Sequence, residues 1–270
     1  MPAESGAVTG GTDMIDRIYH LALSDIGGAR FAILPGDPGR VEKIAMYLEN
    51  PVKMAQNREF VTYSGSLLGS PVLVTSTGIG GPSAAIAMEE LATLGVDTFI
   101  RVGTCGGMQR EVLGGNIVIP TGAIRMEGTS QEYLPVEFPA VPDFAVLSAL
   151  VGAAALVGAT DGGKLSFHTG VVQSKDSFYG QHEPQRMPVA LELEYKWQAY
   201  IKGGALASEM ECASLFCVAA CLKVRVGAVL ACVWNQERAR EGLSNPDCPE
   251  TDDVIKVAIK AIESLISQKI

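Results

Sequence analysis

Short apolar runs rich in β-branched residues alternate along the chain with segments whose apolar positions recur at helical spacing. Val41, Ile44, Ala45 and Leu48, for example, fall at i, i+3, i+4 and i+7, on one face of a helix. Buried strands are predicted at 31–34, 72–74, 98–102, 117–119 and 226–234. Longer helices are predicted at 82–94, 143–156, 210–222 and 252–266. Such alternation predicts an α/β fold, with three αβα layers around a mixed, largely parallel central sheet.

No linker divides this pattern, so we expect a single domain over residues 16–270, preceded by a flexible segment at 1–15. The first twelve residues are rich in glycine, include Glu4 and lack the apolar stretch of a secretory signal peptide. We therefore expect the protein in the cytoplasm.

Composition and charge exclude several classes of partner. The chain has 270 residues, 47% of them hydrophobic, and no apolar run reaches the roughly 18 residues of a membrane span. Its net charge of −9 repels nucleic acid and anionic lipid, and no local basic patch offsets it. The six cysteines form no C-x-x-C pair and lie in no metal-ligand spacing with a histidine. We expect free thiols and no structural zinc.

Glycine-rich turns are predicted directly after three of the strands, where ligands bind in sheets of this kind. They are 35–40, 76–83 and 101–107. A dinucleotide fits poorly, because Ser83 stands where the last glycine of G-x-G-x-x-G belongs and no acidic residue ends the next strand. The absence of a Gly-Lys-Ser/Thr sequence excludes a Walker loop.

A phosphate ion suits these turns better. Glycine lets backbone N–H groups approach an anion, and arginine adds a forked, permanently charged set of donors. Gly36 with Arg40, and Arg101 with Thr104, offer this chemistry. A solvated arginine at a helix start explains Arg40 equally well. Arg101, however, lies inside an apolar strand, where burial without an anionic partner is costly.

Five short motifs follow one another along the chain. They are Gly36-Asp37-Pro38-Gly39-Arg40, Arg58-Glu59-Phe60, Ser76-Thr77-Gly78-Ile79-Gly80-Gly81-Pro82-Ser83, Arg101-Val102-Gly103-Thr104 and Glu209-Met210-Glu211. In this order they resemble the motifs of the nucleoside phosphorylase family, and among its members those that act on uridine. The resemblance extends from about His20 to the last predicted helix.

The resemblance implies a phosphate site, a ribose site and a base site. The phosphate site would consist of Gly36, Arg40, Arg101 and Thr104, with Arg58 from a neighbouring subunit. The ribose site would consist of Met210, Glu211 and His20, the last from the neighbouring subunit, and the base site of Phe178, Gln181 and Arg186. Catalysis would depend on Arg40, Arg101 and Gln181. A surface arginine and a packed loop histidine remain the alternatives for Arg58 and His20.

The base site departs from the commonest pattern of the family. Members that act on uridine often carry an arginine two residues after the glutamine, where this chain has Glu183, so Arg186 would have to replace it. Gln236 also stands where an arginine is often found. Purine-specific members place an aspartate in that loop, whereas 233–236 contains no acid, which favours uridine.

Glu209 and Glu211 are two residues apart at a predicted helix start. At that spacing their carboxylates would point in different directions, so that only Glu211 faces the sugar.

The implied activity is reversible phosphorolysis of uridine to uracil and ribose 1-phosphate, with inorganic phosphate as co-substrate and no required cofactor. A purine nucleoside phosphorylase and a catalytically silent nucleoside-binding protein remain as alternatives.

The resemblance also implies a potassium ion at a subunit interface, held by Glu59, Ser83 and the carbonyl oxygen of Ile79. An ordinary interface carboxylate explains Glu59 as well.

Because His20 and Arg58 would act across an interface, we expect a homo-oligomer with shared active sites, at minimum a dimer and commonly a hexamer built as a trimer of dimers.

Overall fold

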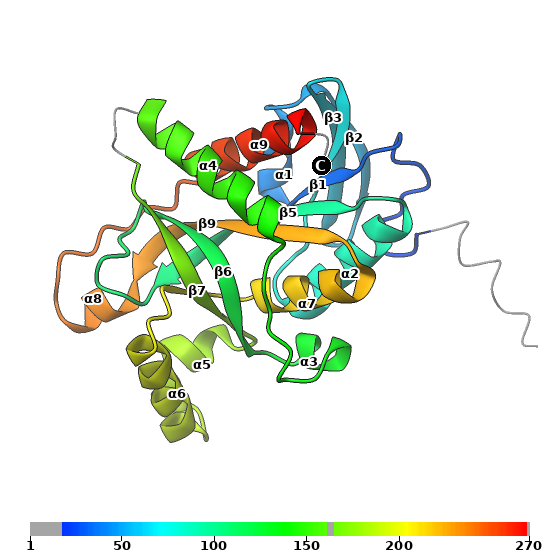
Figure 1. Cartoon of the computed structure of the whole chain (residues 1–270). Helices are drawn as coiled ribbons and strands as arrows, with labels where there is room; N and C mark the ends of the chain where they lie inside the picture. Colours follow the sequence, from blue (N-terminus) through cyan, green and yellow to red (C-terminus); the bar gives the residue numbers. More distant parts are fainter. Residues whose placement is uncertain (1–17, 161–164, 269–270) are drawn as a thin grey trace, which may run out of the picture.

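The computed structural model describes residues 18–160 and 165–268, and the segment 1–15 lies outside the described residues. Helices cover both faces of one mixed sheet, which confirms the predicted α/β fold (Figure 1). The strands are β1 (Phe31–Pro35), β2 (Glu49–Asn57), β3 (Phe60–Leu67), β4 (Ser70–Thr75), β5 (Thr98–Gly107), β6 (Ile117–Met126), β7 (Phe167–Lys175), β8 (Ala207–Glu209) and β9 (Arg225–Asn235). The helices are α1 (Gly39–Ala45), α2 (Gly81–Thr93), α3 (Thr129–Tyr133), α4 (Phe144–Thr160), α5 (Phe178–His182), the 3₁₀ helix η1 (Pro184–Arg186), α6 (Ala190–Lys202), α7 (Cys212–Leu222), α8 (Gln236–Arg240) and α9 (Asp252–Ser267).

The described strands form a sheet in the order β2-β3-β4-β1-β5-β8-β7-β6-β9, and β9 also pairs with β5. Parallel ladders join β1 to β4 and β5, β5 to β9, and β7 to β6 and β8. The ladders β2-β3, β3-β4, β5-β8 and β6-β9 are antiparallel. Because β9 pairs with both β5 and β6, the strands β5-β8-β7-β6-β9 close a ring. In that ring Ser208 of β8 lies opposite Gly106 of β5 and Gln173 of β7.

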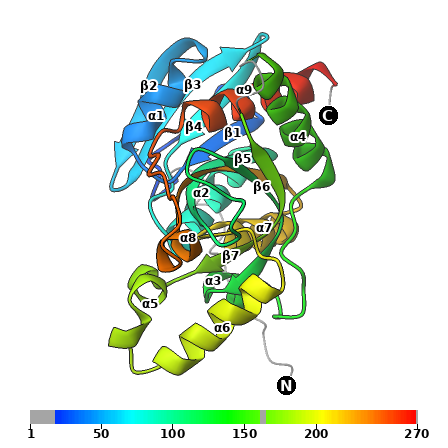
Figure 2. The same cartoon turned by 90° about the vertical axis from the view of Figure 1, so that its left-hand side faces the viewer.

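Two apolar layers hold the helices to the sheet. One lies under α1, α4 and α9, and the other under α2 and α7 together with the segment 18–29. In Figure 2, α5 and α6 lie at the lower end of the molecule, away from α4 and α9. Of the base-site residues predicted from the sequence, Phe178 and Gln181 belong to α5 and Arg186 ends η1, so they lie on or next to this projecting part.

The predicted strands and longer helices all form, with small changes at their ends. The turn predicted at 101–107 is wrong, because β5 continues to Gly107, paired with β9 along its length and with β8 at its end. The helix predicted from 210 begins at Cys212. Asp143 caps α4 as predicted, since its Oδ1 accepts the N–H of Val146 at 3.0 Å.

Two negative findings apply to the described ranges. No helix in residues 18–160 or 165–268 combines the length and apolar character needed to cross a bilayer. All six cysteines, which fall within these ranges, are free, as the sequence predicts.

Candidate active site

The two glycine-rich turns that do form, 35–40 and 76–83, open onto a cavity of about 830 Å³. Most of the site residues predicted from the sequence line this cavity. They are Gly36, Arg40, Glu59, Ile79, Ser83, Arg101, Thr104, Phe178, Gln181, Met210 and Glu211. His20, Arg58 and Arg186 lie outside it. The structure therefore brings together six segments that are separate in the sequence.

Arg101 lies on β5, only 4% exposed, between two carboxylates. Its Nη2 donates to Oε2 of Glu211, and its Nε lies 3.4 Å from Oε2 of Glu209. Burial alone would lower the pKa of Arg101, but the two carboxylates outweigh it and raise the pKa above its ordinary value. Nη1 has no hydrogen-bond partner among the described residues, and a Cβ added to Gly36 would lie 4.0 Å from it. A charged donor is thus left free beside the first glycine turn.

The prediction that Glu209 and Glu211 point in different directions is wrong, because both converge on Arg101. Glu209 ends β8 rather than starting a helix, and its carboxylate accepts the N–H groups of Glu211 at 2.8 Å and Cys212 at 3.0 Å. The carboxylate thus satisfies the first free N–H group of α7. Oε1 of Glu211 accepts the N–H of Gly80 at 2.6 Å, and Gly80 has a φ of 94°, which favours glycine.

Arg40 enters the same end of the cavity from the start of α1. Its Nη1 donates to the carbonyl oxygen of Val102 at 3.3 Å. Burial lowers the pKa of Arg40, Asp37 opposes that shift, and Arg101 adds to it. The two guanidinium groups therefore lie in each other's field. An anion bound between them would relieve that repulsion.

The other end of the cavity is formed by α5. The ring of Phe178 is half exposed and lies 4.3 Å from the ring of His182, centroid to centroid. Gln181 is buried, and both ends of its carboxamide have partners. Its Oε1 accepts from Oγ of Ser208 at 2.6 Å, and its Nε2 donates to Oε1 of Gln236 at 2.9 Å. This end offers an aromatic face and an oriented amide.

Lys175, the last residue of β7, is a cavity residue that the sequence reasoning missed. Its side chain is 5% exposed, and its Nζ donates to Oγ of Ser208 at 2.9 Å and lies 5.9 Å from the ring centroid of Phe178. Burial lowers the pKa of Lys175 to about 8, although Glu209 and Glu211 oppose that shift. A cation that loses its proton near neutral pH therefore faces the base end.

A usable signal for Lys175 existed in the sequence. Lys175 lies three positions after the apolar pair Val171-Val172, whereas the apolar residues that identified Arg101 flank that arginine directly, so the signal for Lys175 is weaker. The signal was missed because β7 itself was not predicted.

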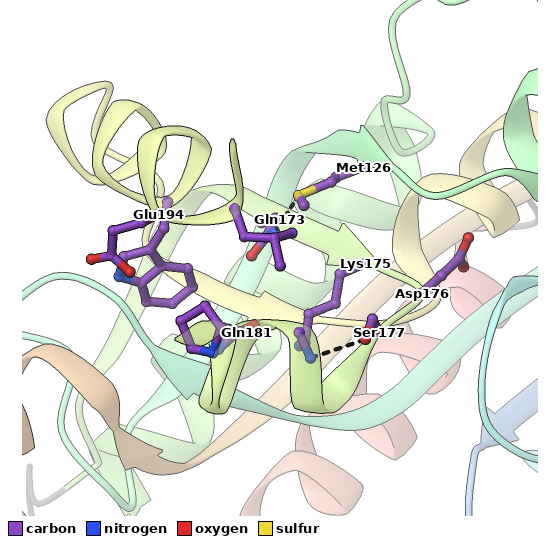
Figure 3. Close-up of a pocket in the computed structure, with 11 residues that line it drawn as sticks. Met126, Gln173, Lys175, Asp176, Ser177, Gln181 and Glu194 are labelled. Carbon is purple, nitrogen blue, oxygen red and sulfur yellow. Dashed lines mark hydrogen bonds between the residues drawn. The ribbon is translucent and has the colours of Figure 1, made fainter. Parts of the chain in front are cut away.

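A second cavity of about 170 Å³, shown in Figure 3, adjoins the first, because Lys175 and Gln181 line both. Gln173 and Lys175 are two residues apart on β7, so their side chains point to the same side of the strand. Nε2 of Gln173 donates to Sδ of Met126 at 3.0 Å. Lys175 and Gln181 thus form a wall that the two cavities share.

Arg186 lies away from the base end. It ends η1, is exposed, and pairs with Glu183 three residues earlier. The 3₁₀ turn brings positions i and i+3 to the same side, so the guanidinium is held at the carboxylate outside the cavity. Lys175 is instead linked to Gln181, because both bond to the hydroxyl of Ser208.

His20 and Arg58 lie together near the rim of the cavity. Nδ1 of His20 is 2.6 Å from Oε1 of Glu90, and Nδ2 of Asn57 donates to the carbonyl oxygen of His20 at 2.9 Å. Arg58 is exposed in the turn between β2 and β3. Both residues therefore sit at the surface of their own chain.

Oxygen ligands gather beside this rim. Oε1 of Glu59 accepts from Oγ of Ser83 at 2.8 Å, and Oγ of Ser83 also contacts the carbonyl oxygen of Thr77. A Cβ at Gly78 would lie 2.8 Å from Cγ of Glu59 and 2.9 Å from Oγ of Ser83. The missing side chain lets the carboxylate and the hydroxyl approach each other. Hard oxygen donors of this kind fit an alkali ion.

Comparisons with known proteins agree with this geometry. The model of the Phosphorylase superfamily matches residues 30–268. The uridine phosphorylase of Treponema pallidum (strain Nichols) is 54% identical over 252 residues, which cover 93% of this chain and 95% of that protein. The uridine phosphorylase of Escherichia coli (strain K12) is 40% identical over 259 residues, 92% and 98% of the two chains. A guanosine phosphorylase of Halorubrum lacusprofundi is 37% identical over 253 residues, 91% and 98% of the two chains.

Proposed function

The chain belongs to the phosphorylase superfamily, and we propose that it catalyses the reversible phosphorolysis of uridine to uracil and ribose 1-phosphate. One observation carries the proposal: a pair of arginines, a buried carboxylate and an aromatic residue with an amide line a single cavity. Arg40 and Arg101 lie at one end, Phe178 and Gln181 at the other, and Glu211 lies at Arg101. Phosphate, ribose and base would bind in that order.

Phosphate binds at Arg40, Arg101, Thr104 and the turn at Gly36 in this proposal. The unpaired Nη1 of Arg101 supplies a charged donor that no carboxylate occupies among the described residues. Fork-shaped guanidinium groups match the oxygens of a dianion, so a protein of net charge −9 can still bind it locally. Phosphate is the co-substrate, and the proposal requires no cofactor.

Ribose binds at Met210 and Glu211. One carboxylate oxygen of Glu211 accepts from Gly80 and the other from Arg101, and each keeps a lone pair for a ribose hydroxyl. The same carboxylate thus ties the sugar to the arginine that holds phosphate. This contact sets the distance between the attacking oxygen and the anomeric carbon.

The uracil ring stacks on Phe178, and Gln181 reads its polar edge. As the bond to the base lengthens, positive charge grows on the ribose and negative charge grows on the uracil oxygens. The bound phosphate stabilises the sugar and then attacks its anomeric carbon, while Gln181 donates to the departing base. We assign the cation at this end to Lys175 rather than Arg186, because Lys175 is buried beside Ser208 and Phe178.

A direct test is a panel of uridine, thymidine, inosine and guanosine, each with and without phosphate, with free base and sugar phosphate measured by chromatography. We expect fast release of uracil only when phosphate is present, with one ribose 1-phosphate formed per uracil. Equal rates without phosphate would identify a hydrolase instead. Binding of uridine without turnover would identify a nucleoside-binding protein.

His20 and Arg58 are proposed to complete the cavity of a neighbouring subunit, which requires at least a dimer and is compatible with a hexamer built as a trimer of dimers. Their place at the surface near the rim supports this. Arg40→Ala and Arg58→Ala subunits, each inactive alone, should regain about a quarter of the wild-type activity when mixed and reassociated, because each hybrid dimer holds one intact site. No recovery in mixtures shown to exchange subunits would place Arg58 elsewhere.

The potassium ion is proposed at Glu59, Ser83 and the carbonyl oxygen of Ile79, where it would stabilise the interface. Thermal unfolding gives a readout that does not depend on turnover. The midpoint should rise in potassium chloride relative to tetramethylammonium chloride, and Glu59→Gln should remove the difference. An equal midpoint in both salts would leave Glu59 an ordinary interface carboxylate. The cytoplasmic location expected from the sequence stays a prediction.

A further inference from the structure

A carboxamide can read a base in two orientations of nearly the same shape. With its oxygen toward the ring nitrogen N3, it accepts the N3–H of uracil. Turned over, it donates to the bare N3 of cytosine. The choice between uridine and cytidine therefore depends on what holds the amide of Gln181 in one orientation.

Hydrogen-bond logic fixes the oxygen of this amide from one side. The ammonium group of Lys175 can only donate, so Oγ of Ser208, 2.9 Å away, must accept from it. The single hydroxyl hydrogen of Ser208 is then free to donate onward, and its partner at 2.6 Å is Oε1 of Gln181. With an –NH₂ group in that place, the hydroxyl would accept from both neighbours and its own hydrogen would lose the acceptor it has in Oε1 of Gln181. The oxygen of Gln181 therefore faces Ser208.

The nitrogen of the same amide is fixed from the opposite side. Nε2 of Gln236 donates to the backbone carbonyl oxygen of Gln181 at 3.2 Å, and a carbonyl can only accept. Gln236 must therefore turn its own Oε1 away from that carbonyl, and it accepts Nε2 of Gln181 at 2.9 Å. Two independent constraints thus agree on one orientation.

Burial makes these constraints strong. Lys175, Ser208, Gln181 and Gln236 are each no more than 9% exposed, so water cannot easily replace a lost partner. A reversed Gln181 would remove the acceptor of the Ser208 hydroxyl at one end and set two acceptor oxygens against each other at the Gln236 end.

We propose that Ser208 and Gln236 are positioning residues that lock the amide of Gln181 in the uracil-reading orientation and so exclude cytidine. The inference rests on the proposed function, since it concerns the base end of the same cavity. In this orientation Oε1 keeps a lone pair for N3–H, and Nε2 keeps one hydrogen for a neighbouring carbonyl oxygen of uracil. Cytosine would set the lone pair of its N3 against the lone pair of Oε1.

The test compares uridine and cytidine in Gln236→Leu, Ser208→Ala and Ser208→Thr. A site built to hydrogen-bond its substrate rejects the mismatched analogue by a factor on the order of 10⁴ in kcat/KM, and we expect that ratio in the wild type. Gln236→Leu and Ser208→Ala should each lower the ratio by a factor of about 10 or more, since a mismatch at one hydrogen bond is of this size. Ser208→Thr keeps the hydroxyl and should keep the ratio.

A merely structural role predicts a different result. It would lower the rates with both nucleosides equally and leave their ratio unchanged, and that result would overturn the proposal. Circular dichroism and thermal midpoints establish that each variant is folded. If Gln236→Leu does not fold, Ser208→Ala decides, because it removes only one buried hydroxyl.

Equilibrium binding separates this inference from the proposed function. Calorimetry of uracil and cytosine with the wild type and both variants measures base selection without turnover. If the wild type does not split uridine, the proposed function fails, yet a loss of uracil preference in the variants would still support the positioning role. An unchanged preference in folded variants would overturn it whatever the activity.

Discussion

Arg101 and Lys175 face the same cavity from opposite ends, and their surroundings differ in kind. Arg101 lies between Glu209 and Glu211, which raise its pKa. Lys175 donates to the neutral hydroxyl of Ser208, and burial lowers its pKa to about 8. One end of the cavity therefore carries a permanent, fully compensated charge. The other carries a charge that can be lost near neutral pH.

The difference fits two tasks. A dianion that must be bound in every cycle needs donors that never lose their protons, and paired carboxylates keep Arg101 charged and fixed. A base that becomes negative only while it departs gains from a cation such as Lys175, whose hydrogen-bond partner is a neutral hydroxyl and on which Glu209 and Glu211 act only at longer distance. Burial without an ionic partner costs stability, so the two ends also contribute differently to folding.

Removal of Arg101 is expected to have the largest effect. Arg101→Met leaves two buried carboxylates without their cation, so the free energy of unfolding should fall by about 3–5 kcal/mol. kcat/KM for phosphate should fall by a factor on the order of 10³, since a charged donor is lost. Urea denaturation and initial rates measure the two effects. The matched control is Arg110→Met, which breaks an exposed pair with Glu241 and should change stability by less than about 1 kcal/mol.

Removal of Lys175 should change stability in the opposite direction. Its pKa is about 8 in the folded chain against 10.5 for the free side chain, so burial of its charge destabilises the protein fully below pH 8. Lys175→Met should raise the free energy of unfolding by up to about 3 kcal/mol at pH 7. The gain should shrink between pH 8 and 10.5 as the wild type releases its proton. A gain that does not depend on pH would exclude titration of Lys175 as its cause.

The same substitution should slow turnover by a factor on the order of 10², because the departing uracil loses its cation. Wild-type activity should decline above about pH 8, as the ammonium group near Glu209 and Glu211 loses its proton, and Lys175→Met should lack this inflection. Exposed Lys196→Met is the control and should keep the wild-type profile. An inflection that survives in Lys175→Met would belong to another group or to uridine itself.

The smallest effect is expected at Arg186, although the sequence nominated it for the base site. It pairs with Glu183 outside the cavity, so Arg186→Ala should change kcat/KM for uridine by less than about twofold, as expected for an exposed ion pair. Steady-state kinetics with uridine measures this. A loss comparable to that of Lys175→Met would mean that the segment 183–186 closes over the base during turnover.

The phosphate end could be predicted because its signals are local. Glycine turns after strands, together with one cation inside an apolar run, predict anion-binding chemistry at Gly36, Arg40 and Arg101, and the resemblance to the family implied that the three share one site. The pairing of Glu209 with Arg101 could not be predicted, since it depends on β8, a strand of three residues wedged between β5 and β7.

The base end shows where sequence patterns fail. The first five residues of β7 are half-buried or exposed in no regular alternation, and only the last four are buried. Neither the strand nor Lys175 was therefore predicted. β2 is exposed along most of its length, and α6 buries only Trp197, so neither shows a period that distinguishes it from a loop. Arg186 was predicted from its position shortly after Gln181, but the 3₁₀ helix η1 places its side chain against Glu183, outside the cavity.

Arg101 and Thr104 lie within β5, a strand that pairs with neighbours on both sides. Phe178 and Gln181 instead belong to α5, which lies in a connection that adds no strand to the sheet. Residues 176–189 can therefore be exchanged without cutting a ladder. A graft of this stretch from a relative with another base preference would replace Phe178 and Gln181 and leave the dependence on phosphate in place, but a change in the choice of nucleoside would also require exchange of Ser208 on β8 and Gln236 on α8. The choice of base thus depends on three separate segments of the chain.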